Sequence, residues 1–158
     1  MIDKYALQKI RSIADYQFGK GVGLKFFPEN SEIISSRNTG KIRYVYLENE
    51  LLSTLRPTTG LFILTISGAK RMLCKVESPR LLVRIEDEAE PFISRGRSVF
   101  AKHVKAADEE IRPNEEVIVV NNKNEVLAVG RALLSGMEMK AFSRGVAVIV
   151  RHGVSEKS

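Results

Sequence analysis

The sequence predicts an α+β protein, in which a small N-terminal α+β domain with a meandering antiparallel sheet precedes a small β-barrel. Three observations lead to this prediction. Apolar residues recur at helical spacing over residues 4–18, which is typical of an amphipathic helix. Short extended runs separated by turn residues follow, as expected for hairpins. From residue 81 onward, short strands and turns alternate regularly, which favours a barrel.

The predicted helices of the first half depend on their capping residues. Asp3 can cap a helix over residues 4–18, and Gly19 can end it. Ser67 is predicted to cap a second helix, which must stop before Pro79 because the residue before a proline avoids helical angles.

The strands of the first half are predicted from extended runs. They are expected at 23–27, 32–36, 42–47, 51–55 and 61–65. Asn38-Thr39-Gly40 is interpreted as a hairpin turn in which the glycine supplies a positive φ.

The second half is dominated by predicted strands. They are expected at 81–85, 99–104, 117–120, 125–135 and 145–151, with a short helical piece at 88–94 and a hairpin loop at 121–124. We expect residues 154–158 to form a frayed tail.

Composition excludes several classes of protein. The chain has 158 residues, of which 44% are hydrophobic and 28% are charged, as in an ordinary globular protein. Its single cysteine, Cys74, excludes a disulfide framework and a cysteine metal site. No apolar run approaches the roughly 20 residues that span a bilayer, and residues 1–5 lack the apolar core of a signal peptide. We therefore expect a reduced, cytoplasmic protein without a membrane partner.

Charge is unevenly distributed along the chain. Residues 1–78 hold 12 Lys/Arg and 7 Asp/Glu, hence 12 − 7 = +5, and residues 79–158 hold 13 and 12, hence +1. The segment Arg95 to Lys105 is rich in cations, and no acidic residue occurs from Pro91 to Ala107. Such a segment is typical of a phosphate-binding surface, although a solvated surface rich in Lys, Arg and Glu would look similar.

Residues suited to catalysis are scattered. His103 and His152 have no neighbours at metal-ligand spacing, and Cys74 is interpreted as a half-buried structural residue. Asp15 is interpreted as a surface residue or a hydrogen-bond partner at a helix end. We expect no catalytic residue, no cofactor and no metal, and only a pocket that gathered Asp15, Cys74 or His103 would favour an enzyme.

The second half resembles a PUA domain, the small barrel found in RNA-modification enzymes. The similarity is carried by Gly96-Arg97-Ser98-Val99-Phe100-Ala101-Lys102, by 108–117, by 127–132 and by 145–153. Where the family's turn carries glycine this chain has Asn114, which tolerates positive φ. The resemblance implies a PUA-type β-barrel over residues 79–153, after an accessory domain over residues 1–78 and before the tail.

The first half is similar to the accessory domain that precedes the PUA domain in archaeal tRNA-guanine transglycosylase and archaeosine synthase. The matching segments are 15–19, 36–43, 55–57 and 60–65. The catalytic barrel of those enzymes, with its aspartates and zinc ligands, is absent from this sequence. The resemblance implies a module that grips the acceptor stem and 3′ end of tRNA, while base exchange occurs on another domain or chain.

The predicted RNA-binding residues combine the cationic segment with cations of later strands. They are Gly96, Arg97, Ser98, Phe100, Lys102, His103, Lys105, Arg131, Arg144, Arg151 and His152. A secondary basic surface of Arg37, Lys41, Arg43 and Arg56 could extend the RNA track or face a protein. Phe100 could stack on an unpaired base, but a core position is the more common fate of such a residue. Gly96 is expected to let a sugar-phosphate backbone approach closely.

The leading hypothesis is a non-catalytic module that binds structured RNA, above all tRNA, beside a catalytic transglycosylase chain. The alternative is a protein-interaction or assembly factor, for example in ribosome maturation. An exposed set of Met137, Met139 and Phe142 would favour a docking surface, whereas a buried set would be a core plug.

Overall fold

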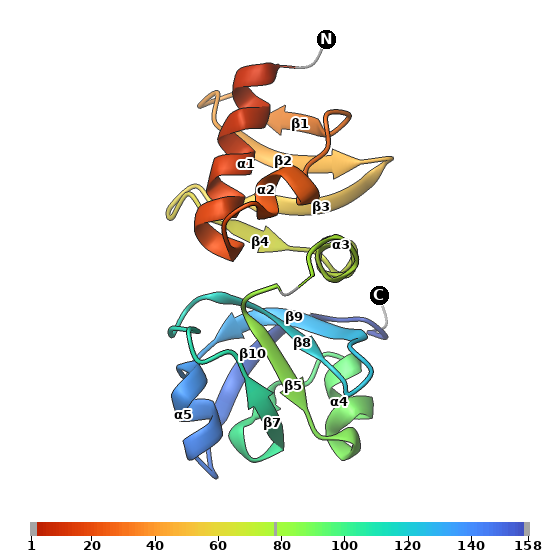
Figure 1. Ribbon diagram of the computed structural model, residues 1–158, viewed down its shortest axis with the longest axis vertical. Coiled ribbons are helices and arrows are strands. Elements are labelled where there is room, and N and C mark those ends of the chain that lie inside the picture. The colour runs from red at the N-terminus through yellow and green to blue at the C-terminus, as the bar shows by residue number, and fades with distance from the viewer. Residues whose placement is uncertain (1–2, 78, 157–158) are drawn as a thin grey trace. The chain divides into compact units, whose positions relative to one another are not determined.

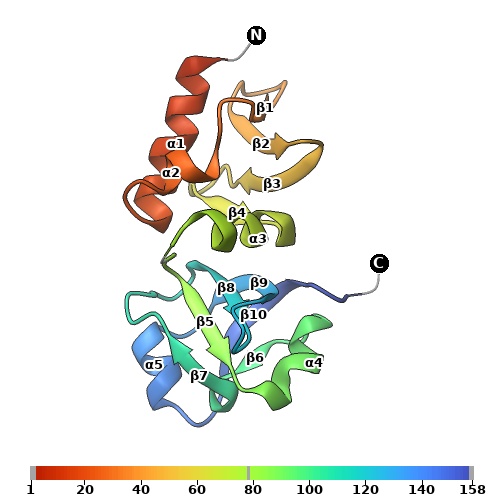
Figure 2. The same cartoon turned by 45° about the vertical axis from the view of Figure 1, so that its right-hand side comes forward.

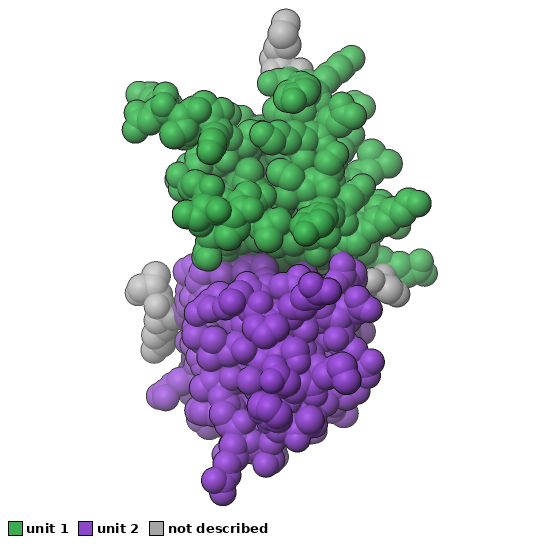
Figure 3. Space-filling view, turned by 90° about the vertical axis from the view of Figure 1, so that its left-hand side faces the viewer, with its two compact units in different colours: residues 1–79 green, residues 80–158 purple. Residues whose placement is uncertain are grey.

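The computed structural model describes residues 3–77 and 79–156 (Figure 1). The chain divides into two compact units, residues 1–79 and 80–158 (Figure 3), and each is described by itself. Unit 1 combines helices with an antiparallel sheet, and unit 2 is a nearly closed barrel. The predicted fold class is therefore confirmed. Among the described residues, no helix has the length and apolar character to cross a bilayer.

The first helix, α1 (Lys4–Phe18), has the predicted bounds. Asp3 Oδ1 accepts hydrogen bonds from the amides of Tyr5 (3.0 Å) and Ala6 (3.1 Å), which caps the helix. The apolar face of α1 is buried, and the side chain of Gln17 hydrogen-bonds both backbone groups of Phe62. The helix is thus fixed to the sheet at its C-terminal end.

The predicted strand at 23–27 is wrong, because this segment forms a second helix, α2 (Val22–Phe26). Gly21 has φ +85°, which turns the chain into the helix. Gly23 lies so close to α1 that a Cβ there would be 2.1 Å from the carbonyl oxygen of Arg11. This backbone contact between helices leaves no room for an extended segment.

The third helix, α3 (Ile66–Lys75), is capped by Thr65 rather than by the predicted Ser67. The Thr65 hydroxyl accepts from the amide of Gly68 at 2.9 Å, and it also lies 3.0 Å from the carbonyl oxygen of Leu52. Ser67 lies inside the first turn, so the prediction placed the helix start too late.

Four antiparallel strands form the sheet of unit 1, in the order β1-β2-β3-β4. They are β1 (Glu32–Ser35), β2 (Ile42–Leu47), β3 (Glu50–Leu55) and β4 (Phe62–Leu64). Helices α1 and α2 lie on one side of this sheet (Figure 2). Phe26, Phe27 and Phe62 form an aromatic core between the layers, with ring centroids 4.5 and 5.3 Å apart. The hairpin turn predicted at Asn38-Thr39-Gly40 is confirmed, since Gly40 has φ +72°.

Six strands form the barrel of unit 2, in the order β6-β10-β9-β8-β5-β7. They are β5 (Leu82–Ile85), β6 (Val99–Phe100), β7 (Val104–Ala107), β8 (Glu116–Val120), β9 (Val126–Ala132) and β10 (Val146–Gly153). Strands β5 and β8 are parallel, and the other pairs are antiparallel. The two edge strands, β6 and β7, follow each other in the chain through a 3-10 turn, η2 (Ala101–His103), so the sheet nearly closes on itself.

Several details of unit 2 differ from the prediction. The single strand expected at 99–104 is divided by η2 into β6 and β7. The strand expected at 125–135 ends at residue 132, because Ser135 caps a helix, α5 (Gly136–Ala141), that was not predicted. The helical piece expected at 88–94 is present as η1 (Asp87–Ala89) and α4 (Glu90–Ser94).

Two local expectations concern the turn at Asn114 and the tail. Asn114 has φ +75°, so it adopts the positive φ that the family turn requires. Residues 154–156 are not frayed, because the amide of Val154 donates to Leu127 O (2.8 Å) and that of Ser155 to Ser94 O (2.7 Å). Residues 157–158 lie outside the described residues.

Candidate nucleic-acid interface

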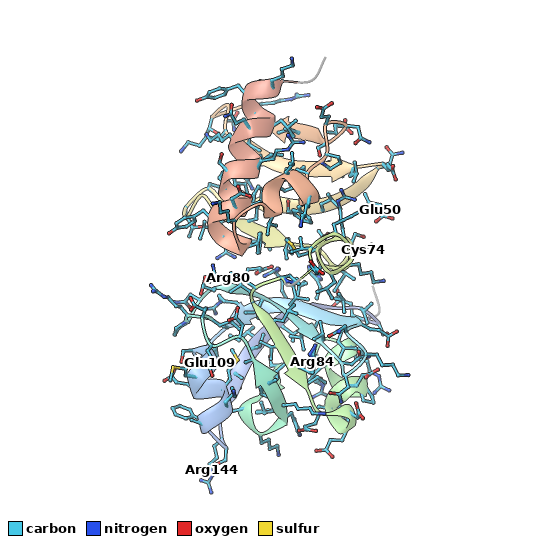
Figure 4. All side chains as sticks on the ribbon, in the orientation of Figure 1. Glu50, Cys74, Arg80, Arg84, Glu109 and Arg144 are labelled. Atoms are coloured by element: carbon cyan, nitrogen blue, oxygen red, sulfur yellow. The ribbon has the colours of Figure 1, made fainter. Side chains whose placement is uncertain are left out.

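The centre of the candidate site is the edge of the barrel where β6 meets the start of β10. Phe100 pairs with Val146, and the amide of Ala101 donates to the carbonyl oxygen of Gly145 at 2.9 Å. This pairing brings Arg144, which is labelled in Figure 4, beside a segment more than 40 residues earlier in the chain. Strand pairing therefore gathers cations from two distant parts of the sequence.

Phe100 lies on the outside of this edge. Its side chain is 46% exposed, whereas that of Val99 is fully buried. The ring of Phe100 meets the half-buried His103 ring edge-on, with the centroids 6.4 Å apart. A core position for Phe100 is therefore excluded, and its ring is available for stacking.

Three cations without a side-chain partner lie on the two segments that meet at Phe100. Arg97, Lys102 and Arg144 are exposed, and within the described part of the chain none makes a side-chain hydrogen bond or an ion pair. Ser98 between them is half-buried. We call Arg97, Phe100, Lys102, His103 and Arg144 the barrel edge.

Lys105 and Arg131 are both engaged with asparagine side chains. Lys105 Nζ donates to Asn122 Oδ1 at 3.0 Å, and Asn122 in turn donates to Asp87 at 2.7 Å. Arg131 Nη1 donates to Asn114 Oδ1 at 2.7 Å. Each cation uses only part of its donor set in these bonds, so both retain the capacity to meet a phosphate while they also fix turns.

Arg151, which the sequence predicts to bind RNA, is engaged with an acidic residue of the barrel. Its guanidinium forms a two-point ion pair with the carboxylate of Glu116, and the side chains are only 28% and 6% exposed. This fork-to-fork pair ties β10 to β8, so we propose that Arg151 serves the fold of the barrel, while its predicted contact with RNA stays a prediction. Glu116 and Arg151 are 35 residues apart in sequence, which is why the pair was missed.

Gly96, which is predicted to let an RNA backbone approach closely, has a carboxylate beside it. A Cβ at Gly96 would lie 3.4 Å from Glu156 Oε2, so a carboxylate already stands on that side. His152 Nδ1 lies 2.6 Å from Glu156 Oε1, and the amide of Gly153 donates to Oε2 at 3.2 Å. The hydrogen bond with His152 is the main cause that holds the pKa of Glu156 below its ordinary value, and the Gly153 amide adds to it. Glu156, which follows His152 by four residues, lies beside both His152 and Gly96. His152 therefore lies near Gly96, with Glu156 as its partner.

The secondary basic residues lie at one end of the unit 1 sheet. Arg37, Lys41 and Arg56 are exposed in the turns before β2 and after β3. Arg43 is partly buried, and its guanidinium carbon lies 5.8 Å from the centroid of the Tyr44 ring. Three of the four predicted residues therefore face solvent together, while Arg43 packs against an aromatic ring.

The residues considered for catalysis remain apart. Asp15 Oδ1 accepts from the amide of Gly23 at 2.7 Å, which is the helix-end hydrogen bond that the sequence predicted. Asp15 lines an open cavity of about 630 Å³ between α1 and α2, but neither Cys74 nor His103 lines it. Cys74 is exposed on α3 rather than half-buried, and the described residues contain no cluster of three His, Cys, Asp or Glu side chains that could hold a metal.

Solved structures with this fold have been found in archaea. A hypothetical protein of Pyrococcus horikoshii OT3 superimposes with a TM-score of 0.78 at 24% identity, covering 98% of this chain and 93% of that one. A conserved PUA domain protein from Thermoplasma acidophilum gives a TM-score of 0.68 at 20% identity, covering 98% and 91%. At these identities the likeness establishes the fold of both units.

Relatives in sequence are much longer. The chain is 44% identical over 147 residues to tRNA-guanine(15) transglycosylase of Methanothermobacter thermautotrophicus, covering 93% of this chain and 22% of that protein. It is 47% identical over 150 residues to the protein of the same name from Pyrococcus abyssi, covering 95% and 25%. The chain thus spans about a quarter of the length of these relatives. Residues 8–79 match the patch-forming domain C2 of tRNA-guanine transglycosylase and residues 82–154 match the PUA domain, so the two halves of the chain belong to these two domain families.

Proposed function

We propose that this protein is an RNA-binding module that holds structured RNA, above all the acceptor stem and 3′ end of tRNA, at the barrel edge. The observation that carries the proposal is the set of exposed cations without a side-chain partner, Arg97, Lys102 and Arg144, on the two paired segments that meet at the exposed Phe100. The name of the sequence relatives, tRNA-guanine(15) transglycosylase, supports tRNA as the ligand.

The barrel edge offers two kinds of contact. Arginine can meet a phosphate with two parallel hydrogen bonds, and each cation neutralises a phosphate and releases a counterion. An aromatic ring on a surface stacks on any unpaired base, and such stacking is worth about 1–3 kcal/mol per base. The edge therefore suits an RNA that offers a helical backbone beside an unpaired end.

The module is proposed to work with a catalytic transglycosylase. Its relatives are about four times longer than this chain, and the two matched domains account for residues 8–79 and 82–154. We propose that a separate transglycosylase chain supplies the chemistry, while this protein supplies affinity for the tRNA.

The test is tRNA binding as a function of salt. Replacing Arg97, Lys102 and Arg144 together with glutamine should lower the slope of log K against log salt by about one for each lost phosphate contact. Phe100→Ala should weaken binding of intact tRNA more than of tRNA whose unpaired 3′ end has been removed, because only the former offers a base to stack. Absent or salt-independent binding by the wild-type protein would exclude the proposal.

A second candidate function is assembly with a protein partner. Met137 and Phe142 of the α5 region are 67% and 46% exposed, whereas Met139 is buried. Exposed large apolar side chains of this kind are typical of protein interfaces. A specific protein that co-purifies after nuclease treatment, and is lost with Met137→Ser/Phe142→Ser, would favour this function.

A further inference from the structure

Two turns of unit 1 share one hydrogen-bond pattern. In residues 36–41, the amide of Gly40 donates to Ser36 O (2.9 Å), that of Ser36 to Lys41 O (2.7 Å) and that of Lys41 to Thr39 Oγ1 (3.3 Å).

The second turn, residues 56–61, repeats this pattern. Gly60 donates to Arg56 O (2.8 Å), Arg56 to Leu61 O (2.9 Å) and Leu61 to Thr59 Oγ1 (3.2 Å). The two glycines have nearly the same backbone angle, with φ +72° at Gly40 and +70° at Gly60. We call residues 36–41 and 56–61 the twin turns.

Sheet topology places the twin turns side by side. The first joins β1 to β2 and the second joins β3 to β4, so in a sheet of order β1-β2-β3-β4 both lie at the same end, on the left in Figure 1. Their centres are two strand spacings apart, which is about 10 Å. The pairing of β2 with β3 sets this spacing, and three hydrogen bonds fix the shape of each turn.

Charge is segregated between the two ends of the sheet. The twin turns carry Arg37, Lys41 and Arg56, all exposed, and no acidic residue. The opposite end carries Glu32, Glu48 and Glu50, of which Glu50 is labelled in Figure 4. The six residues of β2 separate the ends by about 20 Å. This exceeds the Debye length of about 8 Å at physiological salt, so the glutamates do not neutralise the cations.

Free backbone donors accompany these cations. Within the described residues, the amides of Asn38 and Thr39 in the first turn, and of Thr58 and Thr59 in the second, donate to no protein acceptor. Backbone amides next to Arg and Lys are typical phosphate contacts. The twin turns contain no aromatic or large apolar side chain apart from Leu61, and such side chains are what anchor protein interfaces. The surface therefore favours RNA over an acidic protein.

We propose that the twin turns form a second, two-point contact for the phosphate backbone of an RNA helix, with one phosphate group held by each turn. This rests on the proposed function, in which unit 2 binds the same RNA. The two turns are rigid, so they bind best to a ligand whose phosphates are also held at a fixed spacing. In that case neither the protein nor the ligand loses conformational entropy on binding. An RNA duplex meets this condition, and a flexible single strand does not.

The test compares three charge-matched variants for binding to a short RNA duplex, its separate strand and tRNA. The turn variant is Arg37→Gln/Lys41→Gln/Arg56→Gln, and the barrel-edge variant is Arg97→Gln/Lys102→Gln/Arg144→Gln. The control is Lys9→Gln/Lys25→Gln/Lys70→Gln, which removes three exposed cations from α1, α2 and α3. Circular dichroism checks that each variant is folded.

The turn variant should lower the salt slope of duplex binding by about two. At 0.15 M salt each lost contact corresponds to about a fivefold loss, so its affinity should fall about 30-fold. The single strand and the control variant should show a much smaller change.

Each other outcome has a defined meaning. In one outcome the wild-type protein binds RNA, the barrel-edge variant binds weakly, and the turn variant binds as well as the control. This outcome overturns the twin-turn contact and leaves the proposed function standing. If only the turn variant loses affinity, the barrel-edge site is overturned and the twin-turn contact stands. If the turn variant keeps full affinity for RNA but loses binding of a polyglutamate peptide, the surface serves an acidic protein and the inference is overturned.

Discussion

Replacing Arg151 with methionine provides a direct test of its assignment to the fold rather than to RNA. The substitution keeps much of the side-chain volume but removes the guanidinium from Glu116, whose side chain is 6% exposed. Removing one partner of a buried ion pair costs about 3–5 kcal/mol, because it leaves an uncompensated charge. Since the Arg151 side chain is 28% exposed, water can reach the site, and we expect the lower end of that range, about 3 kcal/mol.

This loss is large for a unit of the size of residues 80–158. A change of 1 kcal/mol shifts the melting temperature of such a unit by about 4–8 °C, so Arg151→Met should lower it by about 12–24 °C. The double variant Glu116→Leu/Arg151→Met should recover most of the loss, because apolar residues of similar volume can replace a buried ion pair at little cost.

The assay must separate the two units. All four tyrosines lie in unit 1 and the chain has no tryptophan, so tyrosine fluorescence follows unit 1 and serves as the internal control. Hydrogen exchange of peptides from residues 80–156 follows unit 2. A change in protection below about 0.5 kcal/mol would refute the reasoning, since that is the size of an ordinary surface effect. Loss of one unit of salt slope in tRNA binding by the folded variant would show that Arg151 contacts RNA as the sequence predicts.

Three further predictions concern local features of unit 2. Gly153→Ala should destabilise unit 2 by about 1–3 kcal/mol, because a Cβ at residue 153 would lie 2.3 Å from Ser94 O and 2.6 Å from Gly96 N. Urea titration followed by hydrogen exchange measures this loss. Unchanged protection of residues 94–96 would contradict the close packing of Gly153 against them. Asn114→Ala should be about 1–2 kcal/mol less stable than Asn114→Gly, because both variants lose the hydrogen bond from Arg131 and only alanine is strained at φ +75°; equal thermal midpoints of the two variants would contradict this. Because the pKa of Glu156 is lowered in the folded protein, this carboxylate stabilises the fold at pH above its ordinary pKa of 4.5. The stabilisation is lost as the pH falls through the lower pKa of the folded state. The amide resonance of Gly153 should therefore shift with pH in acid, and Glu156→Gln should abolish that shift.

Local sequence signals predicted those parts of the fold that neighbouring residues determine. The Asp3 cap, the Asn38-Thr39-Gly40 turn and the positive φ at Asn114 each depend on a few adjacent residues. The failure at α2 has a non-local cause, since the segment is helical where Gly23 meets the backbone of Arg11. Sequence analysis likewise left open whether Phe100 is exposed or in the core, and only the closed barrel shows that Val99 is buried and Phe100 exposed.

In the candidate site, too, only features set by neighbouring residues were predictable from the sequence. Arg97 and Lys102 are close in sequence and remain exposed together in the structure. The ion pair of Arg151 was not predictable, because its partner Glu116 lies on another strand. The neutralising role of Glu156 did have a signal, since it follows His152 by four residues. The Thr-Gly pairs at 39–40 and 59–60 are a sequence signal for the twin turns that sequence analysis did not use, and only the strand order shows that the two turns share one end of the sheet.

The place of β10 in the barrel has a consequence for biosynthesis. This strand pairs with both β6 and β9, so the edge at β6 has no neighbour until residues 146–153 are available. Unit 1, in contrast, pairs only consecutive strands between residues 32 and 64, and such short-range contacts form quickly. On a translating ribosome, unit 1 can fold as it emerges. The edge of β6 stays unpaired until β10 leaves the exit tunnel. During that interval, β6 can pair with another nascent chain.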